Sequence, residues 1–179
     1  MSAALVVGIA SLLLACGGSS NPNQQWGTVL SSSAYWALRD AVGPNNHGIC
    51  LGSYSLACNF PVSSVFKCPQ GGTILSSGSI GGYLDQSGSG QLAAQYTLTP
   101  TSCSVAGTML TGTSSITVSG PVNFGNTPSV WPDILKEKGG FSFGPSPSGT
   151  CQINVSVTAN SNSCSFTGTV CGQSVSGNC

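Results

Sequence analysis

The fold is decided by residues 153–170, which read INVSVTANSNSCSFTGTV. Apolar and polar residues alternate on both sides of the polar segment 160–163, and this period of two is typical of strands with one buried face. If the two runs pair as an antiparallel hairpin around that segment, Ala159 lies opposite Cys164 and Val157 opposite Phe166. This register puts the apolar residues of both strands on one face of the sheet.

A similar pattern predicts a second hairpin, in which residues 92–98 pair with 103–109 around the loop 99–102. Leu98 then lies opposite Cys103. The second strands of the two hairpins share a motif, CSVAGT at 103–108 and CSFTGT at 164–169. We interpret the two segments as an internal repeat, and the alternative is chance similarity between two hairpins rich in Ser and Thr.

The rest of the chain predicts more strands and one helix. Strands are expected at 73–80 and 114–124, giving about six to eight in an all-β sandwich or curved antiparallel sheet with hairpin repeats. Tyr35, Leu38 and Val42 recur at helical spacing, which predicts one short helix at 31–42, ending before Gly43-Pro44.

Residues 125–149 are rich in Pro and Gly and hold the main cluster of charge. Pro132 followed by Asp133 predicts one or two helical turns there. Lys136 and Lys138 flank Glu137, which favours a solvated, charged turn.

Composition limits the classes of partner. The chain has four Lys or Arg and four Asp or Glu, so no basic surface exists to neutralise phosphates, and nucleic acid is excluded as a partner. Apolar residues make up 40% of the chain and alternate regularly, so we expect a folded domain rather than a disordered one.

The N-terminus carries an export pattern. Residues 3–15 form an apolar run that is too short for a permanent transmembrane helix and reads as the core of a signal peptide. Its end, LLAC at 13–16 followed by Gly17, resembles the lipobox of bacterial lipoproteins. The resemblance implies cleavage before Cys16 and acylation of Cys16. It also implies a membrane anchor in the cell envelope, and Gly17 in place of Asp favours the outer membrane.

The segments that follow from this resemblance are a signal peptide at 1–15, a lipidated flexible tether at 16–30 and a single β-rich domain at 31–179. The tether is expected because residues 17–25 contain Gly, Ser, Asn, Gln and Pro without any charge.

Cysteine usage agrees with export. With Cys16 reserved for lipid, the remaining cysteines form an even set, for which disulfides are expected in an oxidising compartment. The sequence leaves their connectivity open, but the hairpin register places Cys151 and Cys171 on opposite faces, which disfavours a bridge between them. Cys103 and Cys164 are expected on the buried face, paired with each other or with cysteines nearer the N-terminus. The disulfide candidates are Cys50, Cys58, Cys68, Cys103, Cys151, Cys164, Cys171 and Cys179.

Catalytic groups are scarce. His47 is the only histidine, and although Asp40 is near it in sequence, the chain has no Gly-x-Ser-x-Gly nucleophile motif. A carboxylate pair for glycoside hydrolysis would have to come from Asp40, Asp85, Asp133 and Glu137, and only Asp133 and Glu137 are spaced to share a helix face. We therefore expect no catalytic residues and no enzymatic activity.

Metal and cofactor motifs are equally weak. His47, Cys50, Cys58 and Cys68 include zinc-ligand types, but no tight Cys-x-x-Cys knuckle is present and disulfides explain these cysteines better. No haem-attachment, phosphate-binding or dinucleotide motif occurs, so no cofactor is expected.

The expected function is therefore a non-enzymatic, lipid-anchored envelope protein with a structural, adhesive or binding role. Its partners are the membrane, through the lipid, and components of the envelope or cell surface. The sheet face predicted to point outward is uncharged and rich in hydroxyl groups, which suits packing, carbohydrate contact or exposure to water. Its residues are Gln95, Thr97, Ser104, Ala106, Thr108, Asn154, Ser156, Thr158, Ser165, Thr167 and Thr169.

Two alternatives remain open. One is a small secreted hydrolase that uses His47. The other is a carrier or chaperone of hydrophobic ligands, which resembles the lipoprotein-localisation proteins in being a small lipidated β-shell and needs an unfilled apolar cavity. The expected lining of that cavity is Leu92, Tyr96, Met109, Phe166 and Val170.

Overall fold

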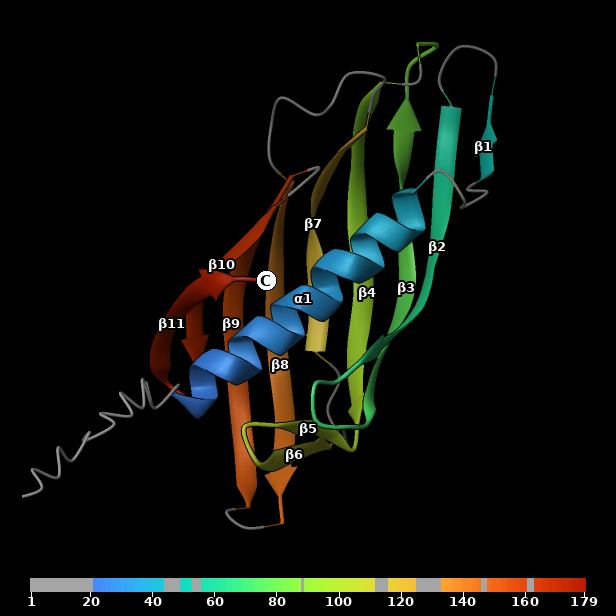
Figure 1. Ribbon diagram of the computed structural model, residues 1–179. Helices are drawn as coiled ribbons and strands as arrows, with labels where there is room; N and C mark the ends of the chain where they lie inside the picture. The colour runs from blue at the N-terminus through green and yellow to red at the C-terminus, as the bar shows by residue number, and fades with distance from the viewer. Residues whose placement is uncertain are drawn as a thin grey trace, which may run out of the picture.

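The computed structural model describes residues 21–43, 49–52, 56–87, 89–111, 116–124, 133–145, 148–160 and 163–179. Over these residues the protein is one open, curved antiparallel sheet with a helix, α1 (Pro22–Val42), lying diagonally across its concave face (Figure 1). The mainly β fold and the curved-sheet form of the prediction are confirmed. The strands are β1 (Ile49–Leu51), β2 (Leu56–Lys67), β3 (Thr73–Leu84), β4 (Gly90–Thr101), β5 (Cys103–Val105), β6 (Thr108–Thr111), β7 (Ile116–Phe124), β8 (Asp133–Gly144), β9 (Gly149–Ala159), β10 (Cys164–Val170) and β11 (Gln173–Asn178).

The strand order is β1-β2-β3-β4-β7-β8-β9-β10-β11, so most neighbours in the sheet are also neighbours in the chain. The short β5–β6 hairpin leaves this path, and β6 pairs with the end of β8 beyond β7. The described part of the sheet therefore holds more strands than the sequence predicted. One edge of the sheet is formed by β11. The other edge is formed by the short β1 and by the part of β2 that extends beyond it.

The helix starts earlier than predicted. Asn21 caps it by accepting a hydrogen bond from the Asn23 amide, and Pro22 occupies the first turn, where its missing N–H costs no bond. The predicted end at Val42 is correct, but residues 22–30 are helical and include the buried Trp26, so the tether predicted at 16–30 is wrong over this part. Residues 1–20, including Cys16, lie outside the described residues.

Small residues of α1 form part of its contact surface with the sheet. A Cβ added to Gly27 would lie 2.8 Å from Cε2 of Phe166 on β10. Ser31, Ser32 and Ser33 are all buried in the same interface. The absence of bulk lets α1 approach the sheet closely.

The hairpin at 153–170 is confirmed with its predicted register, since Ala159 pairs with Cys164 and Val157 pairs with Phe166. The hairpin predicted at 92–109 is wrong. Strand β4 runs on to Thr101 between β3 and β7, and Leu98 pairs with Ser76 and Ile116.

The second strand of that predicted hairpin is broken by a tight turn. Ala106 and Gly107 both have positive φ, 53° and 75°, and join β5 to β6 as a two-residue turn. The turn changes which face each later residue occupies: Thr108, predicted to point outward, is buried, and Met109, predicted to be in the core, is exposed. The shared CS-x-x-GT motif is therefore not a structural repeat.

The region predicted as a charged helical turn is strand β8. Asp133, Leu135 and Glu137 alternate inward, and Lys136 and Lys138 point outward. The long run of β9 beside it supplies backbone partners along the whole of β8, which outweighs the helix-start signals.

Candidate functional site

The two edges of the sheet differ in how far other parts of the protein cover them. At β11, the side-chain amide of Gln24 donates to the Ser176 carbonyl and accepts from the Ser176 amide at 3.2 Å, as a neighbouring strand would. The side-chain Nδ2 of Asn23 donates to the side-chain oxygen of Gln173 at 2.8 Å. Helix α1 therefore covers this edge, as sheet proteins commonly do to prevent unwanted pairing.

At the opposite side, β1 covers only part of β2. It pairs with Ala57, Cys58 and Asn59, and no described strand pairs with the outer side of residues 62–67 (Figure 1).

The direction of the backbone groups follows from the bridge between β1 and β2. Cys50 and Cys58 lie directly opposite each other with a Cα–Cα distance of 4.0 Å. This short distance marks a non-hydrogen-bonded pair, so the odd-numbered residues of β2 direct their N–H and C=O groups outward. The register with β3 is continuous over the whole of β2, so the same holds for Ser63, Val65 and Lys67.

Pro61 agrees with this assignment. It stands at an odd-numbered position, where its missing N–H takes no bond away from the ladder with β3. Pro61 was a signal in the sequence that this part of the strand lacks a hydrogen-bonded neighbour on one side.

A groove of about 600 Å³ runs along this exposed stretch, lined by residues 63–67 of β2 and by Trp36 and Asp40 of α1. Trp36 and Asp40 are one helical turn apart, so they project from the same face of α1. The indole of Trp36 is 58% exposed and packs edge-on against the ring of Tyr35, with centroids 5.6 Å apart. A large aromatic side chain is therefore held beside the open edge.

The other face of the sheet is also apolar at this point. Val65 is 62% exposed and pairs with Leu75 of β3, which is 44% exposed. The open edge is thus flanked by apolar side chains on both faces, Trp36 on one and Val65 with Leu75 on the other.

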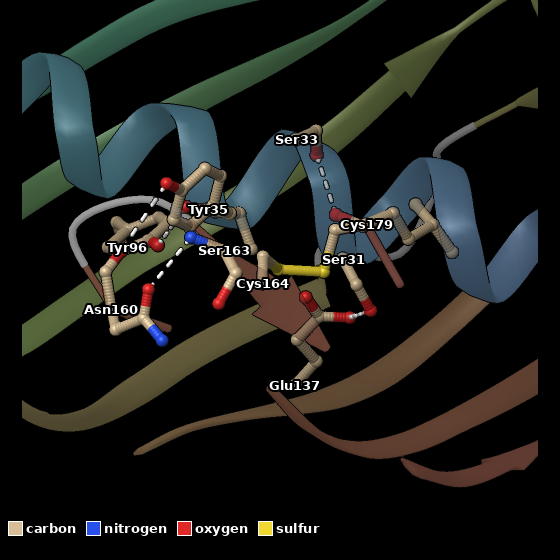
Figure 2. Close-up of a disulfide and its surroundings, with 11 residues drawn as sticks. Ser31, Ser33, Tyr35, Tyr96, Glu137, Asn160, Ser163, Cys164 and Cys179 are labelled. Carbon is tan, nitrogen blue, oxygen red and sulfur yellow. Dashed lines mark hydrogen bonds between the residues drawn. A yellow bond between two sulfur atoms is a disulfide. The ribbon is translucent and has the colours of Figure 1, made fainter. Parts of the chain in front are cut away.

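A second polar group lies under α1. Glu137 of β8 is fully buried and accepts a hydrogen bond from the Ser31 hydroxyl, with Oγ and Oε2 3.5 Å apart (Figure 2). Its other oxygen, Oε1, has no partner. Burial raises the pKa of Glu137 to about 8, and the Ser31 hydrogen bond lowers it only in part. The side chain is therefore mostly protonated at neutral pH.

Tyr96 lies in the same interface and donates its hydroxyl to the Ala34 carbonyl at 2.7 Å. Burial raises the pKa of Tyr96 well above its usual range, and the carboxyl of Glu137 raises it further. Both groups hold α1 to the sheet and are closed off from solvent, so neither is placed to act on a substrate.

The eight cysteines outside the N-terminal segment form four bridges: Cys50–Cys58, Cys68–Cys103, Cys151–Cys171 and Cys164–Cys179. The pairing of Cys103 with a cysteine nearer the N-terminus was one of the predicted alternatives.

Two other predictions about the bridges are wrong. Cys171 leaves the strand alternation because it has a φ of 51° in the turn after β10, and there its amide donates to the Gln152 carbonyl, which brings it beside Cys151. Cys164 pairs with Cys179 because β11 returns along β10 and its end lies beside Cys164 (Figure 2).

The predicted catalytic and metal candidates do not form a cluster among the described residues. His47 lies outside them, Asp85 accepts hydrogen bonds from Ser87 in an exposed turn, and Asp133 and Glu137 are buried. Within the described ranges no group of three or more His, Cys, Asp or Glu is placed to hold a metal ion.

The residues expected to line a carrier cavity are covered. Leu92, Tyr96, Phe166 and Val170 are each at most 3% exposed in the core between α1 and the sheet, and Met109 lies outside the core. In this structure the protein's own helix fills the concave face.

The described part of the chain has no helix of the length and hydrophobicity that crossing a membrane requires. No protein-family model, curated protein or solved structure matches this chain.

Proposed function

We propose that the chain is a non-enzymatic binding protein of the bacterial cell envelope, anchored by lipid on Cys16, that binds an extended polypeptide along the outer side of β2. The observation that carries the proposal is the outward backbone of Ser63, Val65 and Lys67, with which no strand among the described residues pairs, beside the groove of Trp36. Addition of a strand to such an edge is a common mode of peptide recognition.

The geometry supplies both affinity and selectivity. Backbone groups that point outward offer hydrogen bonds to any extended chain, while side chains on the two faces select its sequence. Trp36 on one face and Val65 on the other favour a segment with apolar residues near its centre. Protection of the β11 edge by Gln24 supports the proposal, because it contrasts with the opening left at β2.

Export and anchoring rest on the lipobox resemblance of residues 13–17. The four disulfides support an oxidising compartment, because such bridges rarely persist in the cytosol. The outer membrane is the proposed location because Gly17, and not Asp, follows Cys16.

The binding site is tested by replacing Val65 with a photoreactive amino acid in the full chain and irradiating intact cells. We expect a cross-linked protein product from position 65. The matched control is the same replacement at Ile134, an exposed apolar position on the same face of the sheet in β8. Equal cross-linking at both positions, or none at position 65, would contradict the proposed site.

The anchor is tested with Cys16→Ser. We expect the wild type to incorporate labelled fatty acid and to sediment with membranes, and the variant to do neither. A variant that is labelled and membrane-bound as before would remove the anchoring proposal and leave the binding proposal intact.

A further inference from the structure

We infer that the polypeptide bound along β2 is the β2 strand of a second copy of this chain, which pairs antiparallel about a twofold axis at Val65. This inference rests on the proposed function, because it names the partner for the same edge. The dimer would join two curved sheets into one continuous sheet.

The edge is complementary to itself. With Val65 opposite its own copy, Ser63 of one chain faces Lys67 of the other, and the reverse holds by symmetry. Every outward N–H and C=O of these three residues then has a partner. Pro61 falls beyond one end of this ladder and Pro69 beyond the other, so neither proline removes a hydrogen bond from it.

The side chains fit the same register. On the convex face the two Val65 side chains meet at the axis, each flanked by its own Leu75, so that exposed apolar groups of both copies are covered together. The concave face brings the half-buried Phe66 of each copy opposite Ser64 of the other, next to the groove that Trp36 lines.

Charge also favours a second copy. Each chain has a net charge of zero, so two copies do not repel at long range. In this register Lys67 of one copy faces the uncharged Ser63 of the other on the convex face. The symmetric pairing therefore brings no two like charges opposite each other.

The test uses the full chain purified from membranes in mild detergent, with the mass of the protein part measured by sedimentation or native mass spectrometry. We expect the wild type to have twice the mass of one chain. Val65→Lys places two like charges at the axis and should raise the dissociation constant by about tenfold or more. Ile134→Lys, the same kind of change on the same face but away from the edge, should leave the dimer unchanged.

A charge-swap experiment identifies the partner. Val65→Lys and Val65→Glu should each dimerise more weakly alone than the wild type, and when mixed they should form a heterodimer in preference to either homodimer. A wild type that is monomeric at high concentration, or two variants that fail to pair when mixed, would overturn the inference.

The photoreactive residue at position 65 distinguishes the proposal that β2 binds a polypeptide from the inference that this polypeptide is a second copy of the chain. A cross-link to the same chain supports both. A cross-link to a different protein alone overturns the second-copy inference and keeps the binding proposal. Absence of any specific cross-link overturns both.

Discussion

Ser31 of α1 donates its hydroxyl to Glu137 of β8 across the interface between helix and sheet, with Ser31 Oγ and Glu137 Oε2 3.5 Å apart. Helix and sheet thus share a polar contact inside an apolar core. Because burial raises the pKa of Glu137, this contact is a place where pH acts on the stability of the fold.

The first prediction concerns the free energy of unfolding as a function of pH. The pKa of Glu137 is about 8 in the folded chain against an ordinary value of 4.5, so between these values the folded state keeps a proton that the unfolded state releases. Stability should therefore fall as pH rises from 4.5 to about 8, by at most about 1.4 kcal/mol per pH unit from this group. Above pH 8 both states have lost the proton and the effect levels off.

Glu137→Gln should remove this slope, which denaturant titrations at several pH values would show. Asp85→Asn is the control. Hydrogen bonds from Ser87 hold the pKa of Asp85 in the folded chain below its ordinary value. The contribution of Asp85 to the free energy of unfolding is therefore present above the ordinary pKa of Asp and is lost only in acid. If the Gln variant kept the wild-type slope between pH 5 and pH 8, the role given to Glu137 would be wrong.

The second prediction compares two disulfides. Cys68–Cys103 closes a separation of 35 residues and Cys50–Cys58 one of 8. Loop entropy gives the longer bridge about 4 kcal/mol and the shorter one about 2.5 kcal/mol. Denaturation of the Cys68→Ser/Cys103→Ser variant should show the larger loss, and an equal or greater loss for the Cys50→Ser/Cys58→Ser variant would contradict this order.

The third prediction concerns the protected edge at β11. Gln24→Ala removes both hydrogen bonds to Ser176 and should cost about 1 kcal/mol or more. Hydrogen exchange of the Ser176 amide should speed up by about tenfold, and light scattering should show more self-association. Gln91→Ala, a change at an exposed position of β4, is the control and should alter neither measurement. Unchanged exchange at Ser176 in the Gln24 variant would show that the side chain does not protect the edge.

The fourth prediction concerns the close contact between α1 and β10. Gly27→Leu should destabilise the fold by about 2 kcal/mol or more, because even a Cβ at this position would meet the Phe166 ring. Thr28→Leu, at a half-buried neighbouring position, should have a smaller effect in the same urea titration. Combining Gly27→Leu with Phe166→Ala should cost less than the sum of the two changes, since the smaller side chain makes room. Additive costs would indicate that the two residues are not in contact.

Local patterns predicted much of the sheet. Alternation located β3, β7, β9 and β10, and for the β9–β10 hairpin it also gave the register, because a shift by one residue would expose the whole apolar face. The same reasoning failed for residues 103–109. There the positive φ values of Ala106 and Gly107 reverse the chain, so that β6 pairs back on β5 and then with the end of β8.

The candidate site was not predicted, and the reason is physical. Trp36 and Val65 are ordinary helix and strand residues in sequence, and their exposure depends on which strand is outermost. The same is true of Glu137, whose lysine neighbours suggested a solvated turn although the strand buries it.

The sequence by itself determined the class of fold and the residues of the β9–β10 hairpin that face the core, because alternation of apolar residues is a local property of a strand. Only the tertiary structure decided which cysteines pair, how closely α1 lies on the sheet and which edge stays open. These depend on residues far apart in the chain, whose approach is set by the order of the strands and not by any local pattern.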